Sequence, residues 1–387
     1  MNKFTKNKIL NIAWIGQGDF GDEAMAYVNR LFLKAKGFKE ITYYQHGNIA
    51  KYRGSSDLVV KSLHSFKEKR TIIKIKDFLL LRKFSILLIG GGSVLHSLNN
   101  IKWKLDIIHK LKNIKAGKLF SAGIGISIDP IKNPETEAMC SQFLNEVDYH
   151  IFRDNYSTET AKKISKNSNV FSSIDSTLYL NELCPDEINY AKSLKRESNL
   201  VGMMFIRKVG EEKMYEQNQH FDKYLKLIDH TLERGMNVVL FILYVGPLYP
   251  DVSLNEELKN HSKFPDRVKI VKFDGDIFKI INEISRCGFV ISMRLHGIIM
   301  AYLLGIPFLS LSYNQKNQNF CESVNYPDEY SLDFYRHQNF EEIIKITDQL
   351  LEQGSLVYSN VMPLNNAVEV VKNNYERFYT SLSSKML

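Results

Sequence analysis

An arginine and a histidine follow one apolar strand in the C-terminal half, in the run VISMRLHG (residues 290–297). Arg294 and His296 stand where the strand pattern ends and a helical pattern begins. A guanidinium there can hold a carboxylate or phosphate through two parallel hydrogen bonds. The imidazole can exchange a proton near neutral pH. Arg207 ends another predicted strand of the same half, so we expect a site for a small polyanion.

A glycine-rich loop follows the first predicted strand. Its sequence GQGDFG (residues 16–21) matches the dinucleotide pattern GxGxxG. Asp19, Asp22 and Glu23 would repel a pyrophosphate, and the second strand ends without the acidic residue that holds a ribose. We therefore disfavour nicotinamide binding. Asp22 and Glu23 are then either favourable first-turn helix charge or ligands of a neutral, hydroxyl-rich molecule such as a sugar.

A second glycine corner is GGGS (residues 90–93), which follows a predicted strand at 84–89. Glycines at a strand end leave backbone N–H groups bare for an anion or a closely packed sugar, although a simple tight turn has the same pattern. Arg153 and Asp154 end a later strand. Several such loops at one edge of a sheet favour a binding site there.

Short β-branched and aromatic runs alternate with helical patterns along the chain, which is typical of parallel α/β architecture. The strands are expected near 9–16, 40–46, 84–90, 118–124, 148–153, 169–174, 199–206, 237–244, 268–273, 289–293 and 307–312. The helices are expected near 22–36, 101–115, 134–146, 157–165, 217–234, 276–286, 295–304, 340–352 and 364–382.

The 387 residues suggest two domains. The polar segment 181–198 lacks a strand pattern and is expected to cross between them. We predict a first Rossmann-like domain at 1–184 and a second at 185–387, facing each other across a cleft. The last helix would pack back on the first domain.

The composition is that of a soluble globular protein, with 44% hydrophobic and 24% charged residues. No apolar run reaches the length of a membrane span, and the N-terminus does not resemble a signal peptide. Four cysteines without CxxC or nearby histidine spacing indicate reduced thiols rather than a disulfide frame or zinc site. We expect a cytoplasmic protein.

Residues 61–118 carry the whole excess of positive charge: 14 Lys+Arg against three acids, a local charge of +11 in a chain of +8. The partner could be nucleic acid, an anionic membrane surface or an anionic substrate. The segment lacks the interleaved aromatics of a single-strand binder, so we expect no nucleic acid. On a helical wheel of 101–118, Lys104, Lys112 and Lys115 fall within the apolar arc, which leaves a merely solvated basic face as an alternative.

Four stretches make the sequence similar to the polysaccharide pyruvyl transferase family. They are GDEA (21–24), LLIGGGSVLHS (87–97), RD with Ser157 (153–157) and ISMRLHGIIMAYLLGIPFLSLSY (291–313). The resemblance implies two Rossmann-like domains in a glycosyltransferase-B-type arrangement. It also implies transfer of a pyruvyl group from phosphoenolpyruvate to two hydroxyls of a sugar as a cyclic ketal. The acceptor could be of galactose type, on a lipid-linked polysaccharide precursor at the inner face of the membrane.

The resemblance places Arg294, His296 and a strand-end arginine, here Arg207, on the donor side. His296 is the expected general acid, and Asp22 is the expected base or hydroxyl-orienting group. The expected donor-binding residues are Arg207, Arg294, Ser292, Leu295, Gly297 and Tyr313. The expected acceptor-binding residues are Gly18, Gly21, Glu23, Gly91, Gly92, His96, Asp154 and Asp175, of which Glu23, Asp154 and Asp175 are rival bases. No metal and no resident cofactor are expected.

Three positions depart from the family: Asp19 replaces a common Asn, His96 a frequent Gln and Asn314 a frequent Asp. The first two put the acceptor in doubt. A nucleotide-sugar glycosyltransferase is an alternative, but Met300 stands where such enzymes usually have a carboxylate. A non-catalytic sugar-binding protein of the same fold is a second alternative.

Overall fold

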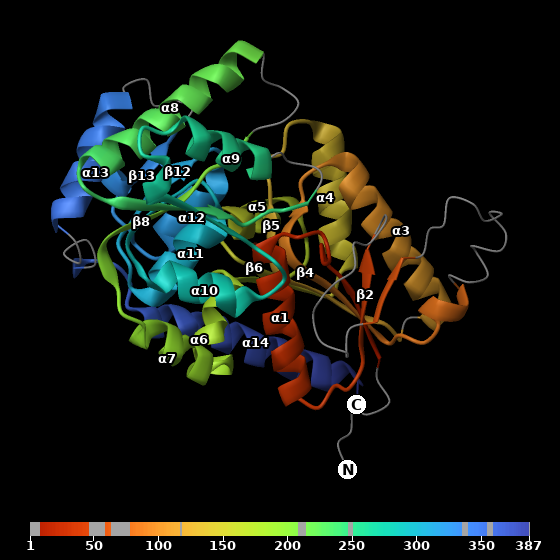
Figure 1. Ribbon diagram of the computed structural model, residues 1–387. Helices are drawn as coiled ribbons and strands as arrows, with labels where there is room; N and C mark the ends of the chain where they lie inside the picture. Colours follow the sequence, from red (N-terminus) through yellow and green to blue (C-terminus); the bar gives the residue numbers. More distant parts are fainter. Residues whose placement is uncertain are drawn as a thin grey trace. The chain divides into compact units, whose positions relative to one another are not determined.

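The computed structural model divides into two compact units (Figure 1). The residues it describes are 8–45, 59–62, 78–116, 118–207, 214–246, 251–334, 340–353 and 359–386. The first unit comprises Met1–Gln17, Asp22–Tyr179 and Val368–Leu387, and the second comprises Gly18–Gly21 and Leu180–Ala367. Each unit is described by itself.

The first unit contains a parallel sheet of seven strands in the order β3-β2-β1-β4-β5-β6-β7. The strands are β1 (Ile9–Ile12), β2 (Ile41–Gln45), β3 (Val59–Ser62), β4 (Ile86–Leu95), β5 (Phe120–Ile128), β6 (Tyr149–Phe152) and β7 (Val170–Ser172). This order reverses direction at β1 and β4, as in the doubly wound dinucleotide folds.

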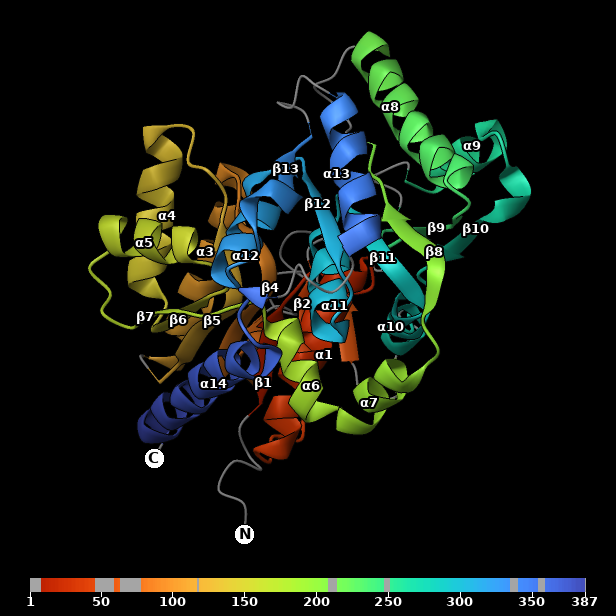
Figure 2. The same ribbon diagram turned by 90° about the vertical axis from the view of Figure 1, so that its left-hand side faces the viewer.

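Helices cover both faces of the first sheet. They are α1 (Phe20–Ala35), α3 (Leu98–Lys115), α4 (Pro134–Glu146), α5 (Asn155–Ile164), the short η1 (Ser176–Tyr179) and α14 (Leu364–Met386) from Val368 onward. Figure 2 shows α3, α4 and α5 grouped on one side. On α1 and α14, Phe32 and Tyr375 make an edge-to-face contact with ring centroids 4.9 Å apart, so these two helices pack together. Apolar side chains such as Leu87, Ile108 and Phe143 are fully buried between sheet and helices.

The second unit repeats the same topology with six parallel strands in the order β10-β9-β8-β11-β12-β13. The strands are β8 (Glu197–Met204), β9 (Asn237–Ile242), β10 (Val268–Lys272), β11 (Cys287–Ser292), β12 (Phe308–Ser312) and β13 (Ser331–Asp333). β8 and β11 lie at the point where the strand order reverses.

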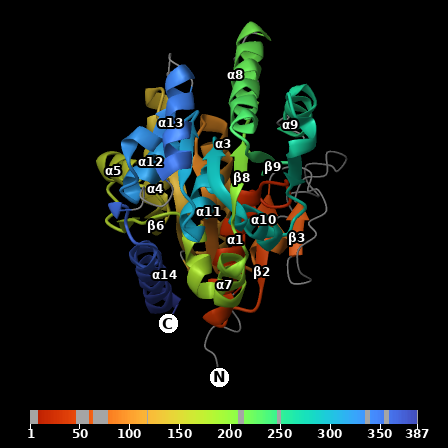
Figure 3. The same cartoon turned by 60° about the vertical axis from the view of Figure 1, so that its left-hand side comes forward.

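The helices of the second unit include both predicted and unpredicted ones. They are α6 (Leu180–Leu183), α7 (Pro185–Ser193), α8 (Met214–Glu233), α9 (Asp251–His261), η2 (Pro265–Arg267), α10 (Ile277–Ser285), α11 (Leu295–Leu304), α12 (Gln315–Ser323), η3 (Asp328–Tyr330) and α13 (Phe340–Gln353). Figure 3 shows α7, α10 and α11 as one group, and these three helices contact one another.

Local capping explains where several helices begin and end. Asp154 accepts a hydrogen bond from the Ser157 N–H at the start of α5, and Asn314 does the same for the Lys316 N–H at α12. At the end of α11, Gly305 adopts a left-handed conformation (φ 64°) that a residue with a side chain would resist. The first two caps fix the strand-to-helix corners after β6 and β12, and Gly305 fixes the turn from α11 into β12.

The eleven predicted strands and nine predicted helices are all present, with ends shifted by up to several residues. The strands β3 and β13 and the helices α9 and α12 were not predicted. The segment 181–198 forms α6, α7 and the start of β8 rather than an irregular crossing. Among the described residues, no helix is long and apolar enough to cross a membrane.

The contact-based division differs in detail from the expected boundary at 184/185. The units divide at Tyr179 and Leu180, and Gly18–Gly21 belong to the second unit although they lie early in the chain. The part of α14 from Val368 onward is counted with the first unit, where we expected the last helix. The expected cleft between the units stays a prediction.

Candidate functional site

The strand order of each unit indicates where ligands should bind. In open parallel sheets, ligands bind beyond the carboxyl ends of the strands at the point where the order reverses. In the second unit, that point is the end of β8 and β11, followed by Arg207 and by residues 293–296. In the first unit, it is the end of β1 and β4; Gly16 follows β1, and the glycines 90–92 lie within β4.

A hydroxyl shapes the corner that presents Arg294 and His296. Ser292 Oγ accepts a hydrogen bond from the Arg294 N–H (3.0 Å) and donates to the Arg294 carbonyl (2.8 Å). Gly297 has no space for a side chain, since a Cβ there would lie 2.1 Å from Met204 Sδ and 2.3 Å from Ser292 Oγ. Ser292 and Gly297 therefore build the corner, and Leu295 is the first residue of α11 between the two predicted functional side chains.

The Arg294 guanidinium is anchored by a buried carboxylate. Its Nη2 donates to Asp251 Oδ2, and Asp251 is 1% exposed. The guanidinium carbon lies 5.7 Å from the centre of the Tyr244 ring. Arg294 Nε is buried and has no hydrogen-bond partner among the described residues. A buried donor without a partner is costly, so this nitrogen is suited to an anionic ligand.

Arg207 is held by the same helix. Its backbone N–H donates to Asp251 Oδ1 (3.3 Å), and its Nη2 donates to Glu257 Oε2 (2.7 Å). Both Asp251 and Glu257 lie on α9. Because β8 and β11 are paired neighbours, the structure brings Arg207 and Arg294 to adjacent strand ends, as the sequence predicted.

His296 packs directly on the backbone of Gly21. A Cβ built on Gly21 would lie 1.8 Å from His296 Nδ1, although the φ of Gly21 is not in the left-handed region. The segment around Gly21 is tied to the second unit by hydrogen bonds from the Phe20 N–H to the Leu243 carbonyl (2.9 Å) and from the Val245 N–H to the Gly18 carbonyl (2.9 Å). The position of the His296 imidazole thus excludes a side chain at Gly21, the last glycine of GxGxxG.

The charges around Arg294 perturb one another. Burial alone would lower the pKa of Arg294, but the nearby Asp251, Tyr313 and Asp19 raise it above its usual value. Burial raises the pKa of Asp251 despite the opposing effect of Arg294. Burial likewise raises the pKa of the Tyr313 hydroxyl. Arg294 therefore stays a cation, and it interacts electrostatically with Tyr313.

In the first unit, Asp22 lies against the glycines of β4. A Cβ built on Gly92 would lie 2.7 Å from Asp22 Oδ1, and Gly91 and Gly92 have φ angles of 72° and 84°. Such angles favour glycine. A Cβ on Gly91 would lie 3.1 Å from Met25 Cβ. Asp22, Gly91 and Gly92 therefore form one compact group.

The strand β4 does not end before these glycines. We expected GGGS to follow the strand as a loop with bare N–H groups, but β4 continues through Leu95, and Gly90 and Gly92 pair with Ile124 and Ile126 of β5. The pairing register shifts between Ser93 and Leu95. The left-handed glycines bend the strand within the sheet instead of ending it.

The three rival carboxylates of the first unit are engaged in structural contacts. Glu23 Oε1 accepts the Gly16 N–H (2.6 Å), and Asp154 Oδ1 accepts the Ser157 N–H (2.7 Å) as a helix cap. Asp175 Oδ2 accepts a hydrogen bond from Arg153 Nη1 (3.2 Å), and Asp175 Oδ1 accepts hydrogen bonds from the N–H and the hydroxyl of Thr177. All three are at least 95% buried. The structure therefore does not gather them around Asp22.

The remaining predicted acceptor-side residues divide between the two units. His96 is exposed beyond the end of β4. Gly18, whose φ is 74°, and Gly21 belong to the second unit, the one that carries Arg207 and Arg294, rather than to the first.

The described residues match a known family over most of their length. The family model described as polysaccharide pyruvyl transferase matches residues 19–315. The chain belongs to the polysaccharide pyruvyl transferase family. Membership indicates a transferase of pyruvyl groups in polysaccharide biosynthesis. A search of curated proteins finds no match.

Solved structures that resemble this pyruvyl transferase family member share its fold. A UDP-N-acetylglucosamine 2-epimerase from Rickettsia bellii aligns with a TM-score of 0.62 at 11% identity, over 97% of this chain and 96% of that chain. The enzyme from Methanocaldococcus jannaschii aligns at 0.59 and 10% identity, over 95% and 99%. A putative one from Listeria monocytogenes aligns at 0.58 and 11%, over 98% and 96%. The predicted α/β class with two Rossmann-like domains of glycosyltransferase-B type is confirmed.

Sequence reasoning missed Asp251, the carboxylate that contacts both arginines of this family member. Asp251 does not directly follow a predicted strand, and the helix that it opens was not predicted. The sequence therefore offered no strand-to-helix signal for it. Asp19 was counted only as a charge that repels pyrophosphate, yet it lies near Arg294 and its backbone forms a β-bridge with Tyr244.

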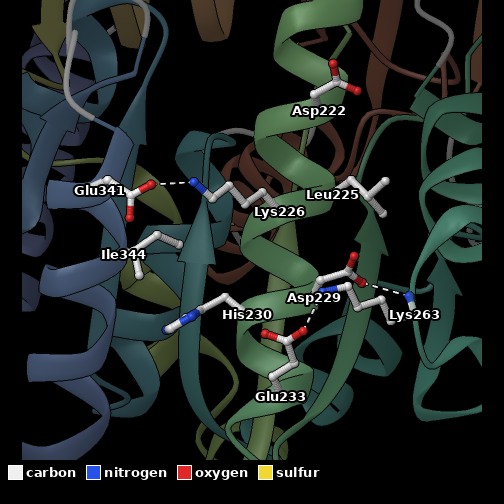
Figure 4. A pocket seen from close by; sticks show the side chains of 9 residues that line it. All are labelled: Asp222, Leu225, Lys226, Asp229, His230, Glu233, Lys263, Glu341 and Ile344. Carbon is white, nitrogen blue, oxygen red and sulfur yellow. Dashed lines mark hydrogen bonds and ion pairs between the residues drawn. The ribbon is translucent and has the colours of Figure 1, made fainter.

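A surface cavity of about 340 Å³ in the second unit lies between α8 and α13 and contains none of the predicted site residues (Figure 4). Lys226 of α8 reaches Glu341 of α13, and Lys263 Nζ donates to Glu233 Oε1 (2.5 Å). These lysine–carboxylate pairs neutralise much of the charge at its rim. We assign no ligand to this cavity.

Proposed function

We propose that this pyruvyl transferase uses phosphoenolpyruvate as donor and forms a cyclic pyruvate ketal on two hydroxyls of a sugar. The observation that carries the proposal is Arg294, whose buried Nε has no hydrogen-bond partner among the described residues, with His296 two positions away. Arg207 ends the neighbouring strand. Phosphoenolpyruvate carries a carboxylate and a phosphate, which two guanidinium groups can bind.

On the donor side, Arg294 and Arg207 hold the anion and His296 is the general acid. His296 protonates the methylene carbon of phosphoenolpyruvate, and positive charge develops at C2. A general acid–base step of this kind supplies about 10²–10⁴-fold in rate. The packing of His296 on Gly21 supports the assignment, because it restricts where the imidazole can lie.

On the acceptor side, Asp22 is the base that takes the proton of the attacking hydroxyl. The first hydroxyl bonds to C2, the C–O bond to phosphate breaks, and the second hydroxyl closes the ketal. Of the two hydroxyl protons, one replaces the proton that His296 gave to the methylene carbon and the other leaves with inorganic phosphate. Asp22 is favoured over Glu23, Asp154 and Asp175, because those three are at least 95% buried in structural contacts.

The acceptor is a sugar of galactose type on a lipid-linked polysaccharide precursor, and residues 61–118 contact an anionic membrane surface. Residues 63–77 and 117 of this segment lie outside the described residues. One of its lysines does not contribute to such a surface: Lys104 is 5% exposed, and burial lowers its pKa to about 7. Flotation with anionic liposomes at low salt tests the contact, and absence of binding contradicts it.

One experiment separates the candidate reactions. The protein is incubated with phosphoenolpyruvate and a lipid-linked oligosaccharide, and the product is analysed by mass spectrometry together with release of inorganic phosphate. A gain of one pyruvyl ketal with equimolar phosphate is expected. Release of UDP from a UDP-sugar instead would indicate a glycosyltransferase. Turnover of neither donor would indicate a sugar-binding protein.

A further inference from the structure

The helix α9 contacts both arginines of the donor side. Asp251, its first residue, accepts from the Arg207 N–H through Oδ1 and from Arg294 Nη2 through Oδ2. Glu257, on the same helix, accepts from Arg207 Nη2. Among the described residues, Asp251 forms an ion pair with Arg294 and Glu257 forms one with Arg207.

The two carboxylates differ in burial. Asp251 is 1% exposed, so its charge is shielded from water and its contacts are strong. The Glu257 side chain is 46% exposed, and the Arg207 side chain is 27% exposed. Exposed ion pairs of this kind contribute little, and a competing anion can replace the carboxylate.

We propose that Asp251 is a positioning residue that sets the two arginines for the donor, and that Glu257 occupies Arg207 in place of the donor anion until the donor displaces it. The inference rests on the proposed function, since it concerns the same anion. One carboxylate oxygen of Asp251 accepts from Arg207, beyond the end of β8, and the other accepts from Arg294, beyond the end of β11. Asp251 therefore ties the two strand ends together while leaving Arg294 Nε for the ligand.

The proposal predicts opposite effects for the two carboxylates. In Asp251→Asn, the amide presents an N–H group to Arg294 Nη2 or to the Arg207 N–H, so one contact is lost. Binding of phosphoenolpyruvate should weaken about tenfold to a hundredfold, as for loss of a hydrogen bond to a charged group. In Glu257→Gln, the competitor loses its charge, and binding should tighten about threefold.

The matched control is Glu256→Gln. Glu256 is the neighbour of Glu257 on α9 and pairs instead with Lys272 (2.6 Å), away from both arginines. Glu256→Gln should leave the affinity for phosphoenolpyruvate unchanged. The melting temperature of each variant checks folding. If Asp251→Asn does not fold, Asp251→Glu, which keeps the charge on a longer side chain, replaces it and should also weaken binding.

The experiment is isothermal titration of the parent and the variants with phosphoenolpyruvate and, separately, with inorganic phosphate, followed by steady-state kinetics. The expected result is a higher KM for phosphoenolpyruvate in Asp251→Asn, an unchanged acceptor KM, and tighter binding in Glu257→Gln. Equal affinity in parent and Asp251→Asn, or a raised KM for donor and acceptor alike, would overturn the positioning role. Unchanged or weaker binding in Glu257→Gln would overturn the competitor role.

The two anions separate this inference from the proposed function. A parent protein that binds phosphate but not phosphoenolpyruvate contradicts the proposed donor. The role of Asp251 then stands or falls on whether Asp251→Asn weakens phosphate binding. A parent that binds neither anion overturns both.

Discussion

Each unit holds one arginine–aspartate pair near the carboxyl edge of its sheet, and the two pairs are satisfied to different degrees. In the first unit, Arg153 follows β6 and donates to Asp175, to Ser127 Oγ (3.3 Å) and to Met25 Sδ (3.9 Å). Its side chain and that of Asp175 are 6% and 2% exposed. In the second unit, Arg294 donates to Asp251 and keeps a buried Nε without a described partner.

The difference separates an ion pair that is complete within the protein from one that keeps a donor for the proposed ligand. Asp175 uses both oxygens, one for Arg153 and one for Thr177, so the first pair is complete without a ligand. The second pair is complete only when something accepts from Arg294 Nε. Two arginines at similar positions of two similar folds can thus be told apart by their remaining hydrogen-bonding capacity.

The largest effect is expected for the complete pair. Arg153→Ala leaves Asp175 buried without its cation, and breaking a buried pair in this way costs about 3–5 kcal/mol of stability. Urea unfolding, read as the free energy of unfolding, measures it. The double change Arg153→Met with Asp175→Leu removes both charges and should recover much of the loss. A loss below about 1 kcal/mol for Arg153→Ala would mean that the first pair is not structural.

The next effect concerns the glycines that fit the predicted acid and base. Gly21→Ala forces His296 Nδ1 away from a Cβ that would lie 1.8 Å from it, and kcat should fall about 10²-fold, as for a 1 Å misplacement.

Gly92→Ala should instead raise the acceptor KM, because its Cβ would meet Asp22. Gly235→Ala, at the same φ of 84° as Gly92 but with no neighbour within 4 Å, controls for the backbone strain of Gly92→Ala and for a glycine substitution without a contact. Equal kinetics for Gly21→Ala and Gly235→Ala would refute the His296 contact.

A smaller effect is expected for the incomplete pair. Arg294→Lys keeps the positive charge but loses the forked donors, so affinity for phosphoenolpyruvate should fall about tenfold while stability changes little. Titration calorimetry gives the affinity, and urea unfolding gives the stability. If Arg294→Lys binds as tightly as the parent, the anion is not held by the guanidinium fork.

The smallest effect is a pH dependence in the first unit. His150 in β6 is fully buried beside Leu144, whose carbonyl lies 2.9 Å from Nε2, and burial lowers its pKa from 6.5 to about 4. The unfolded chain therefore binds more protons between these values, and stability falls as the pH drops through this window. From about pH 7.5 to about pH 6, the loss should be about 1 kcal/mol. His150→Gln should lose this contribution, and an unchanged slope of unfolding free energy against pH would contradict the assignment.

The fold was largely predictable, because long helices and strands with one buried face carry a periodic apolar pattern in the sequence. The apolar run that ends at Ile291 is such a signal for β11. The elements that were missed lack such a signal. The strand β13 has three residues, and α12 is a mostly polar helix, so neither carries a periodic apolar pattern.

The site was predictable where residue type and strand end coincide, as for Arg207, Arg294 and His296. It was not predictable where long-range packing decides. Nothing local in the sequence distinguishes Asp22 from Glu23, yet one lies against Gly92 and the other accepts the Gly16 N–H. Asp251 acquires its role only when α9 packs near β8 and β11.

The assignment of Gly18–Gly21 to one unit and of Val368–Leu387 to the other has a consequence for synthesis on the ribosome. Residues 18–21 emerge long before the strands of the second unit exist. The part of α14 from Val368 onward emerges only after nearly all of that unit has been made. During translation the first unit therefore lacks Tyr375, whose hydroxyl donates to Asn29 Oδ1 (2.5 Å) in the folded protein. Until α14 is made, the apolar surface of α1 that Tyr375 covers is exposed. Chaperones that bind nascent chains would find this surface until the last helix docks.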